Sequence, residues 1–78
     1  MDLARQLAES LRRLRREAGL NQSAMAKKLG ISQPTLNRLE TARQNTTLAT
    51  LNRLCRALRC GVCELFEGRV GRKPRRHN

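Results

Sequence analysis

The stretch QSAMAKKLGISQPTLNRLET, residues 22–41, decides the fold of this chain. Its apolar positions fall into two short runs at helical spacing, and Asn21 is a good N-cap for the first run. Gly30 separates the runs, because glycine enters the left-handed turn conformation without the steric cost of a Cβ. Ser32 can cap the second run, where Pro34 is tolerated because first-turn amides lack intrahelical partners. We therefore predict two short helices joined by a tight turn, which is a helix-turn-helix.

Single apolar stripes on both sides of this stretch predict further helices. The upstream stripe begins at Leu3 and predicts a helix over residues 2–18. The downstream stripe begins at Leu48, directly after the expected N-cap Thr47. A last turn or two follows over 62–66, and its apolar residues can seal either the core or a dimer interface. Alternation typical of a strand does not occur over a useful length, so the sequence predicts an all-α fold.

The length and the charge distribution predict one small domain with a basic extension. Seventy-eight residues suffice for a single domain. We assign residues 1–67 to the folded domain. Residues 68–78 contain five basic residues and no acidic ones, and we expect a disordered tail there.

The net charge points to a polyanionic partner. Seventeen Lys and Arg residues against six Asp and Glu residues give a net charge of +11. With one Phe, no Tyr and no Trp, the chain lacks aromatic platforms for stacking unpaired bases, which argues against a single-strand or RNA-loop binder. Double-stranded DNA and an anionic membrane surface remain. Because the sequence has neither a long apolar run nor a signal-peptide core, we expect a cytoplasmic protein that does not span a membrane.

The sequence does not predict an enzyme or a cofactor site. The carboxylates are scattered, and the glycine-rich phosphate-binding pattern is absent. Cys60 and Cys63 form a C-x-x-C motif, and Cys55 with His77 would complete four zinc ligands on paper. Because Cys55 lies on the apolar stripe and a second paired motif is missing, we expect no metal and treat the cysteines as small hydrophobic residues. A redox role for them stays open.

The segment LNQSAMAKKLGISQPTLNRLE, followed by TLATLNRLCRALRCGVCELF, resembles the Cro and phage-repressor family of helix-turn-helix domains, also called the XRE family. The resemblance covers about residues 7–66 and implies a five-helix, all-α fold. Two departures stand out. Thr41 and Ala42 follow the second motif helix where the family often has Asn-Gly, and Arg59 occupies a frequent glycine position, which suggests a less tightly turned helix end.

The second motif helix is expected to present its N-terminal residues to the DNA major groove. Glutamine can bond adenine and arginine can bond guanine, while proline and threonine carbons can pack on a thymine methyl. The expected base-contacting residues are Gln33, Pro34, Thr35, Asn37 and Arg38. The resemblance also implies a phosphate contact by Gln22 that braces Gln33. The full set of expected phosphate-contacting residues is Gln22, Ser32, Thr41, Arg43 and Asn45, and the expected dimer interface is Val62, Leu65 and Phe66.

These features predict a sequence-specific regulator that binds double-stranded DNA as a homodimer on a palindromic operator. Three roles fit: a phage-type repressor, a controller of a restriction-modification operon, and an autoregulating antitoxin with a toxin partner. One alternative is a protein-interaction adaptor that keeps the fold without contacting bases. The other is a membrane-surface binder, although its leucine stripes are needed for the core.

Overall fold

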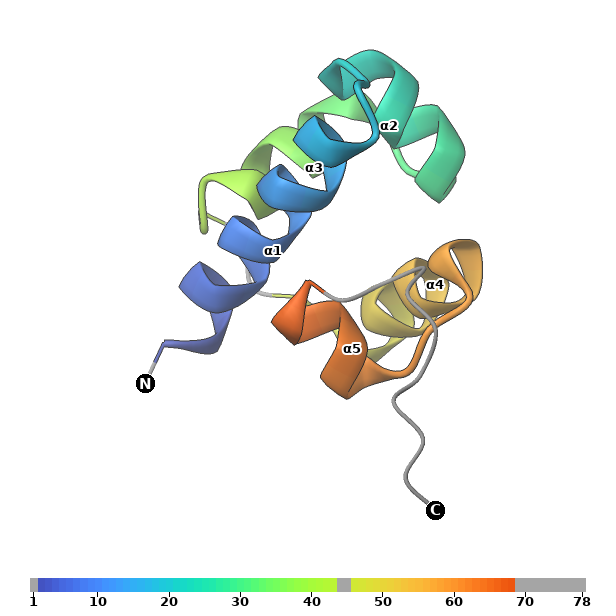
Figure 1. Ribbon diagram of the computed structural model, residues 1–78. Helices are drawn as coiled ribbons and strands as arrows, with labels where there is room; N and C mark the ends of the chain where they lie inside the picture. Colours follow the sequence, from blue (N-terminus) through green and yellow to red (C-terminus); the bar gives the residue numbers. More distant parts are fainter. Residues whose placement is uncertain (1, 44–45, 69–78) are drawn as a thin grey trace.

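The computed structural model describes residues 2–43 and 46–68, and these residues form five α-helices without a strand (Figure 1). The helices are α1 (Leu3–Glu17), α2 (Gln22–Leu29), α3 (Gln33–Glu40), α4 (Leu48–Leu58) and α5 (Val62–Glu67). The all-α, five-helix prediction is confirmed. The expected phosphate contact Asn45 and all of the expected tail except Gly68 lie outside the described residues.

Local hydrogen bonds set the start of each long helix. The Asp2 carboxylate accepts from the Ala4 amide over 3.1 Å at the start of α1. The other three caps are the predicted ones, and each side chain accepts from the amide three residues ahead. They are Asn21, Ser32 and Thr47. These caps satisfy amides that a helix cannot pair internally, which explains why the helix starts follow the sequence closely.

Left-handed residues end α2 and α4. Gly30 ends α2 at φ 74°, as its sequence position predicts. Arg59 ends α4 at φ 54° and ψ 51°, so the expectation of a less tightly turned end there is wrong. Ala42 also has a positive φ, 58°, and the Arg43 amide still donates to the Arg38 carbonyl over 2.9 Å. At these two exposed non-glycine positions, helix-ending backbone hydrogen bonds accompany a conformation that costs about 1 kcal/mol relative to glycine.

The core is a cluster of leucines drawn from all five helices. Helix α3 packs against both α1 and α2, while α4 packs on α2 and α5 packs on α1 (Figure 1). The largest fully buried apolar side chains are Leu7, Leu11, Met25, Leu29, Leu36, Leu39, Leu54 and Leu65. The apolar face of α3 therefore packs against α1 and α2, and the opposite face of α3 is exposed.

The leucines that begin two of the predicted apolar stripes do not join the core. Leu48 is 84% exposed and Leu3 is 59% exposed, although both continue the stripe of their helix. Each stands at the first position of its helix, beyond the last turn that the neighbouring helices cover. Within the described residues, the helices are too short and too polar for any one of them to cross a membrane.

Candidate nucleic-acid interface

The exposed face of α3 carries most of the expected base-contacting residues. Leu36 and Leu39 fix the helix to the core, so the positions between them face outward. Gln33, Pro34 and Arg38 are exposed, and so is Asn37. Thr35 differs, because it is half-buried and its hydroxyl accepts a hydrogen bond from Ser32 over 2.7 Å. The Thr35 hydroxyl is therefore less available to a binding partner than the sequence predicts.

A shallow depression gathers these residues with two others from outside α3. Its volume is about 590 Å³, and one residue from the start of α2 and one from the segment after α3 complete it. The lining residues are Gln22, Gln33, Pro34, Asn37, Arg38 and Arg43. Four of the five predicted base contacts and two of the five predicted phosphate contacts thus lie on one surface, which we call the α3 face. Two arginines and no carboxylate line it.

A buried ion pair beneath the α3 face was not expected from the sequence. Arg15 on α1 donates from Nε to one oxygen of Glu40 over 2.8 Å and from a terminal nitrogen to the other over 3.1 Å. Glu40 is 2% exposed and Arg15 is 22% exposed. Arg12 donates a hydrogen bond to the Glu40 carbonyl oxygen. This bidentate geometry ties the last residue of α3 to α1.

Gln22 links the ion pair to the α3 face. Its Nε2 donates to Glu40 Oε1 over 3.1 Å, and its Oε1 accepts from Asn37 Nδ2 over 3.4 Å. The resemblance implies that Gln22 braces Gln33, whereas the hydrogen-bonded neighbour in the structure is Asn37. The chain of contacts therefore runs from Arg15 through Glu40 and Gln22 to Asn37.

The remaining predicted phosphate contacts surround the ends of α3. Ser32 caps the helix by accepting from the Thr35 amide over 3.2 Å. Thr41 donates from its hydroxyl to the Asn37 carbonyl over 2.8 Å and caps the other end. Arg43 is exposed on the α3 face. The hydroxyls of Ser32 and Thr41 thus form hydrogen bonds within the protein, while the Arg43 side chain is exposed to solvent.

The three predicted dimer residues are placed differently from one another. Val62 is 50% exposed at the start of α5, and Phe66 is half-buried. Leu65 is 0% exposed and belongs to the core of its own chain. The Phe66 carbonyl accepts a 2.5 Å hydrogen bond from the Ser10 hydroxyl, which holds α5 against α1. The surface of α5 that a second chain can touch therefore includes Val62 and part of Phe66, without Leu65.

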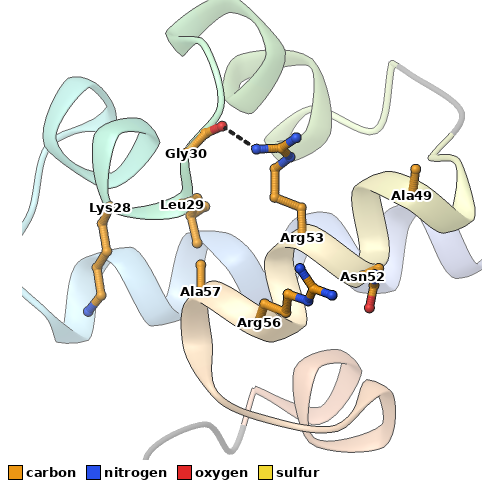
Figure 2. Close-up of a pocket in the computed structure, with 8 residues that line it drawn as sticks. All are labelled: Lys28, Leu29, Gly30, Ala49, Asn52, Arg53, Arg56 and Ala57. Atoms are coloured by element: carbon orange, nitrogen blue, oxygen red, sulfur yellow. Dashed lines mark hydrogen bonds between the residues drawn. The ribbon is translucent and has the colours of Figure 1, made fainter.

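A second basic depression lies between α2 and α4 and shares no lining residue with the α3 face (Figure 2). Its cations are Lys28, Arg53 and Arg56. Figure 2 shows Arg53 reaching from α4 to the helix-turn-helix, where it donates to the Gly30 carbonyl over 3.3 Å. The sequence pattern did not reveal this contact, which fastens the motif turn to α4.

Comparisons with known proteins agree with this geometry. A model of the helix-turn-helix domain family matches residues 6–67. The uncharacterised HTH-type transcriptional regulator y4dJ of Sinorhizobium fredii is 40% identical over 65 residues, which are 83% of this chain and 84% of that protein. Antitoxin HipB of Escherichia coli K12 is 40% identical over 53 residues, which are 68% of this chain and 60% of HipB.

The fold comparison leads to the same family. The crystal structure of the hypothetical transcription factor NHTF from Neisseria superposes with a TM-score of 0.73 at 26% sequence identity, and the match covers 83% of this chain and 75% of that one. Motif, helix order, family match and structural likeness agree. The chain belongs to the XRE-type helix-turn-helix family.

Proposed function

We propose that this chain is a transcriptional regulator that binds a palindromic DNA operator as a homodimer and acts in the cytoplasm. The observation that carries the proposal is the α3 face, where exposed amide and guanidinium groups line one depression along α3. Gln33 and Arg38 are the side chains whose donors best match base edges in the major groove, and Pro34 offers only apolar contact. Arg43 supplies a positive charge for the phosphate backbone.

The hydrogen-bond chain behind this face supports sequence-specific binding. Asn37 is held by Gln22, and Gln22 is held by the buried carboxylate of Glu40. A side chain that is already oriented loses less conformational freedom when it meets a base. We propose that Asn37 enters the major groove in this fixed orientation, while Gln33 and Arg38 adjust to the bases.

Selection of bound sequences from a random duplex pool tests the proposal directly. The selection is run at near-physiological salt with competitor DNA. We expect an enriched inverted repeat whose half-sites are about one helical turn, roughly 34 Å, apart. Salt-sensitive binding without any enriched sequence would refute base-specific binding and favour the protein-interaction adaptor.

Matched arginine variants separate base contacts from general charge. Arg38→Ala removes an exposed arginine from the α3 face, and Arg16→Ala removes an exposed arginine from α1. We expect Arg38→Ala to relax base preference at one operator position and Arg16→Ala to keep it. Gln22→Ala should weaken binding to all sequences more evenly than Arg38→Ala, with a loss of base preference only at the position that Asn37 contacts. Equal effects of both arginine variants on every sequence would contradict the assignment.

The homodimer is proposed to form through the exposed part of α5. Val62 is a half-exposed apolar residue next to the partly covered Phe66. Small domains of this size commonly gain stability by association. Sedimentation of the chain with and without operator DNA tests the proposal, and a monomer that binds single half-sites at all concentrations would refute it.

The similarity to antitoxin HipB favours a second role, in which the regulator also neutralises a toxin. The chain spans 60% of HipB, so the comparison leaves the rest of that protein unmatched. An antitoxin must form a stoichiometric complex with its toxin. Coexpression with a candidate toxin, followed by growth measurement and purification of the complex, tests this role. Continued growth arrest without complex formation would exclude that toxin as the partner.

A further inference from the structure

The end of α4 folds back on itself and brings two cysteines together. Arg59 adopts the left-handed conformation, and the Cys60 amide donates to the Cys55 carbonyl over 3.0 Å. This bond spans six residues and belongs to the helix-ending motif in which the flanking side chains frequently contact each other. Here those side chains are the thiols of Cys55 and Cys60. Both are half-buried and pack against the hydrophobic core.

The surroundings of Cys60 agree with the placement of Cys55 beside it by the backbone hydrogen bond. Burial, the largest cause, acts together with the adjacent Cys55 thiol to raise the pKa of the Cys60 thiol to about 11. The Glu64 carboxylate makes a smaller contribution of the same sign. Cys60 is thus protonated at neutral pH and rests against Cys55.

The structure pairs the cysteines differently from the sequence motif. The C-x-x-C spacing suggests Cys60 with Cys63, yet Cys63 is exposed on α5. The turn at Arg59 instead selects Cys55, five residues before Cys60. In the described part of the chain, no group of three or more potential metal ligands is assembled. Two adjacent thiols therefore favour disulfide chemistry over metal binding.

We propose that Cys55 and Cys60 form a reversible intrachain disulfide by exchange with a small-molecule disulfide such as oxidised glutathione. The thiolate of one cysteine attacks a glutathione sulfur, the glutathione disulfide bond breaks, and one glutathione thiolate leaves. The second cysteine, after losing its proton, attacks the protein sulfur of the mixed disulfide and releases the second glutathione. Two protein thiols lose two protons and two electrons, and one oxidised glutathione becomes two reduced molecules.

The disulfide acts on the connection between α4 and α5. Cys60 precedes Gly61, the N-cap of α5, and Val62 follows directly. A bond from Cys60 to α4 fixes the path into α5 covalently, where the reduced chain relies on hydrogen bonds and packing. Half-burial and the raised pKa of Cys60 keep the exchange slow at neutral pH, so the pair responds to sustained oxidising conditions. This inference does not depend on DNA binding.

Peptide mapping tests the pairing because arginines separate the cysteines. Trypsin cleaves after Arg53, Arg56 and Arg59 and releases Cys55 within residues 54–56, apart from the peptide 60–69. The full chain is incubated with oxidised glutathione, free thiols are alkylated, and the digest is analysed by mass spectrometry. We expect the peptides 54–56 and 60–69 joined, with the loss of two hydrogen masses and one alkylated cysteine. Dithiothreitol should separate them again.

Serine variants identify the partner within the second peptide. Cys63→Ser should keep the joined peptides, while Cys60→Ser should abolish them. Cys63→Ser changes only an exposed side chain, so it decides the question even if a variant at Cys60 fails to fold. A bond between Cys60 and Cys63, or modification of Cys63 alone with Cys55 fully alkylated, would overturn the proposal.

A melting experiment gives an independent measure. Oxidised Cys63→Ser protein should unfold at a higher temperature than the same protein after reduction, because a covalent link restricts the unfolded chain. Cys60→Ser treated in the same way should show no such difference. Equal melting temperatures for oxidised and reduced Cys63→Ser would contradict the proposal that the disulfide stabilises the connection between α4 and α5.

Discussion

Replacing Arg15 with leucine leaves the Glu40 carboxylate buried without its ionic partner. Glu40 is 2% exposed, and two of its three side-chain hydrogen bonds come from Arg15 at 2.8 and 3.1 Å, so only the Gln22 bond survives. Breaking a buried ion pair costs about 3 to 5 kcal/mol. Because Arg15 is 22% exposed, water reaches that side of the ion pair. We therefore expect Arg15→Leu to lower the unfolding free energy by about 3 kcal/mol, the lower end of that range. For a domain of this size that lowers Tm by roughly 12 to 24 °C.

Urea unfolding followed by circular dichroism measures this loss. Arg16→Leu is the matched control, because Arg16 is the exposed neighbour on the same helix and should change the unfolding free energy by less than about 0.5 kcal/mol. The double variant Arg15→Leu, Glu40→Leu removes the stranded charge and should recover part of the stability. A loss below about 1 kcal/mol for Arg15→Leu, or no recovery in the double variant, would refute the buried-pair argument.

Four further predictions concern the α3 face, α5 and the thiols. Arg38→Ala should cost about 1 to 3 kcal/mol of operator binding in a fluorescence titration and leave Tm unchanged, whereas an equal loss on unrelated DNA would contradict base contact. Leu65→Ala should lower the unfolding free energy by about 2.7 to 5 kcal/mol in urea titration, because Leu65 is fully buried. Val62→Asp should weaken dimers in sedimentation with little effect on urea unfolding. Loss of stability without loss of dimers would instead place Val62 in the core and not in the dimer interface. Iodoacetamide should modify Cys63 before Cys60 at pH 7, and Cys60 should react faster as the pH rises toward its pKa of about 11, because only the thiolate is nucleophilic. Peptide mass spectrometry measures the two modification rates. Equal rates for Cys60 and Cys63 at neutral pH would contradict the burial of Cys60.

The helices were predictable because their signals are local. Asn21, Ser32 and Thr47 cap helices through amides three residues away, and Gly30 ends one by its own backbone freedom. Each of these signals fits within a few residues of sequence. The apolar stripes then gave the core-facing side of every helix, apart from helix-terminal positions such as Leu48, where coverage depends on neighbouring helices.

The candidate site was predictable only in part. The outward residues of α3 follow from the positions of its leucines, and the resemblance supplied their expected roles. The ion pair did not follow, because Glu40 is a charged residue that its own helix pattern does not require to be buried. Its partner Arg15 is 25 residues away, and only tertiary packing brings the two together. The left-handed conformation of Arg59 was also not predicted, although the Cys60 amide bonds to the Cys55 carbonyl around it and ends α4.

The packing of α3 against both α1 and α2 has a consequence for how the proposed base specificity can change. Leu36 and Leu39 attach the helix to the core, so substitutions at Gln33 and Arg38 leave the scaffold intact. These two positions are free to diverge separately, one substitution at a time. Asn37 is different, because its amide is joined to Gln22 and a change in one leaves the other without its partner. If the proposed operator binding holds, redesign of its specificity should therefore vary Gln33 and Arg38 singly and treat Asn37 and Gln22 as one unit.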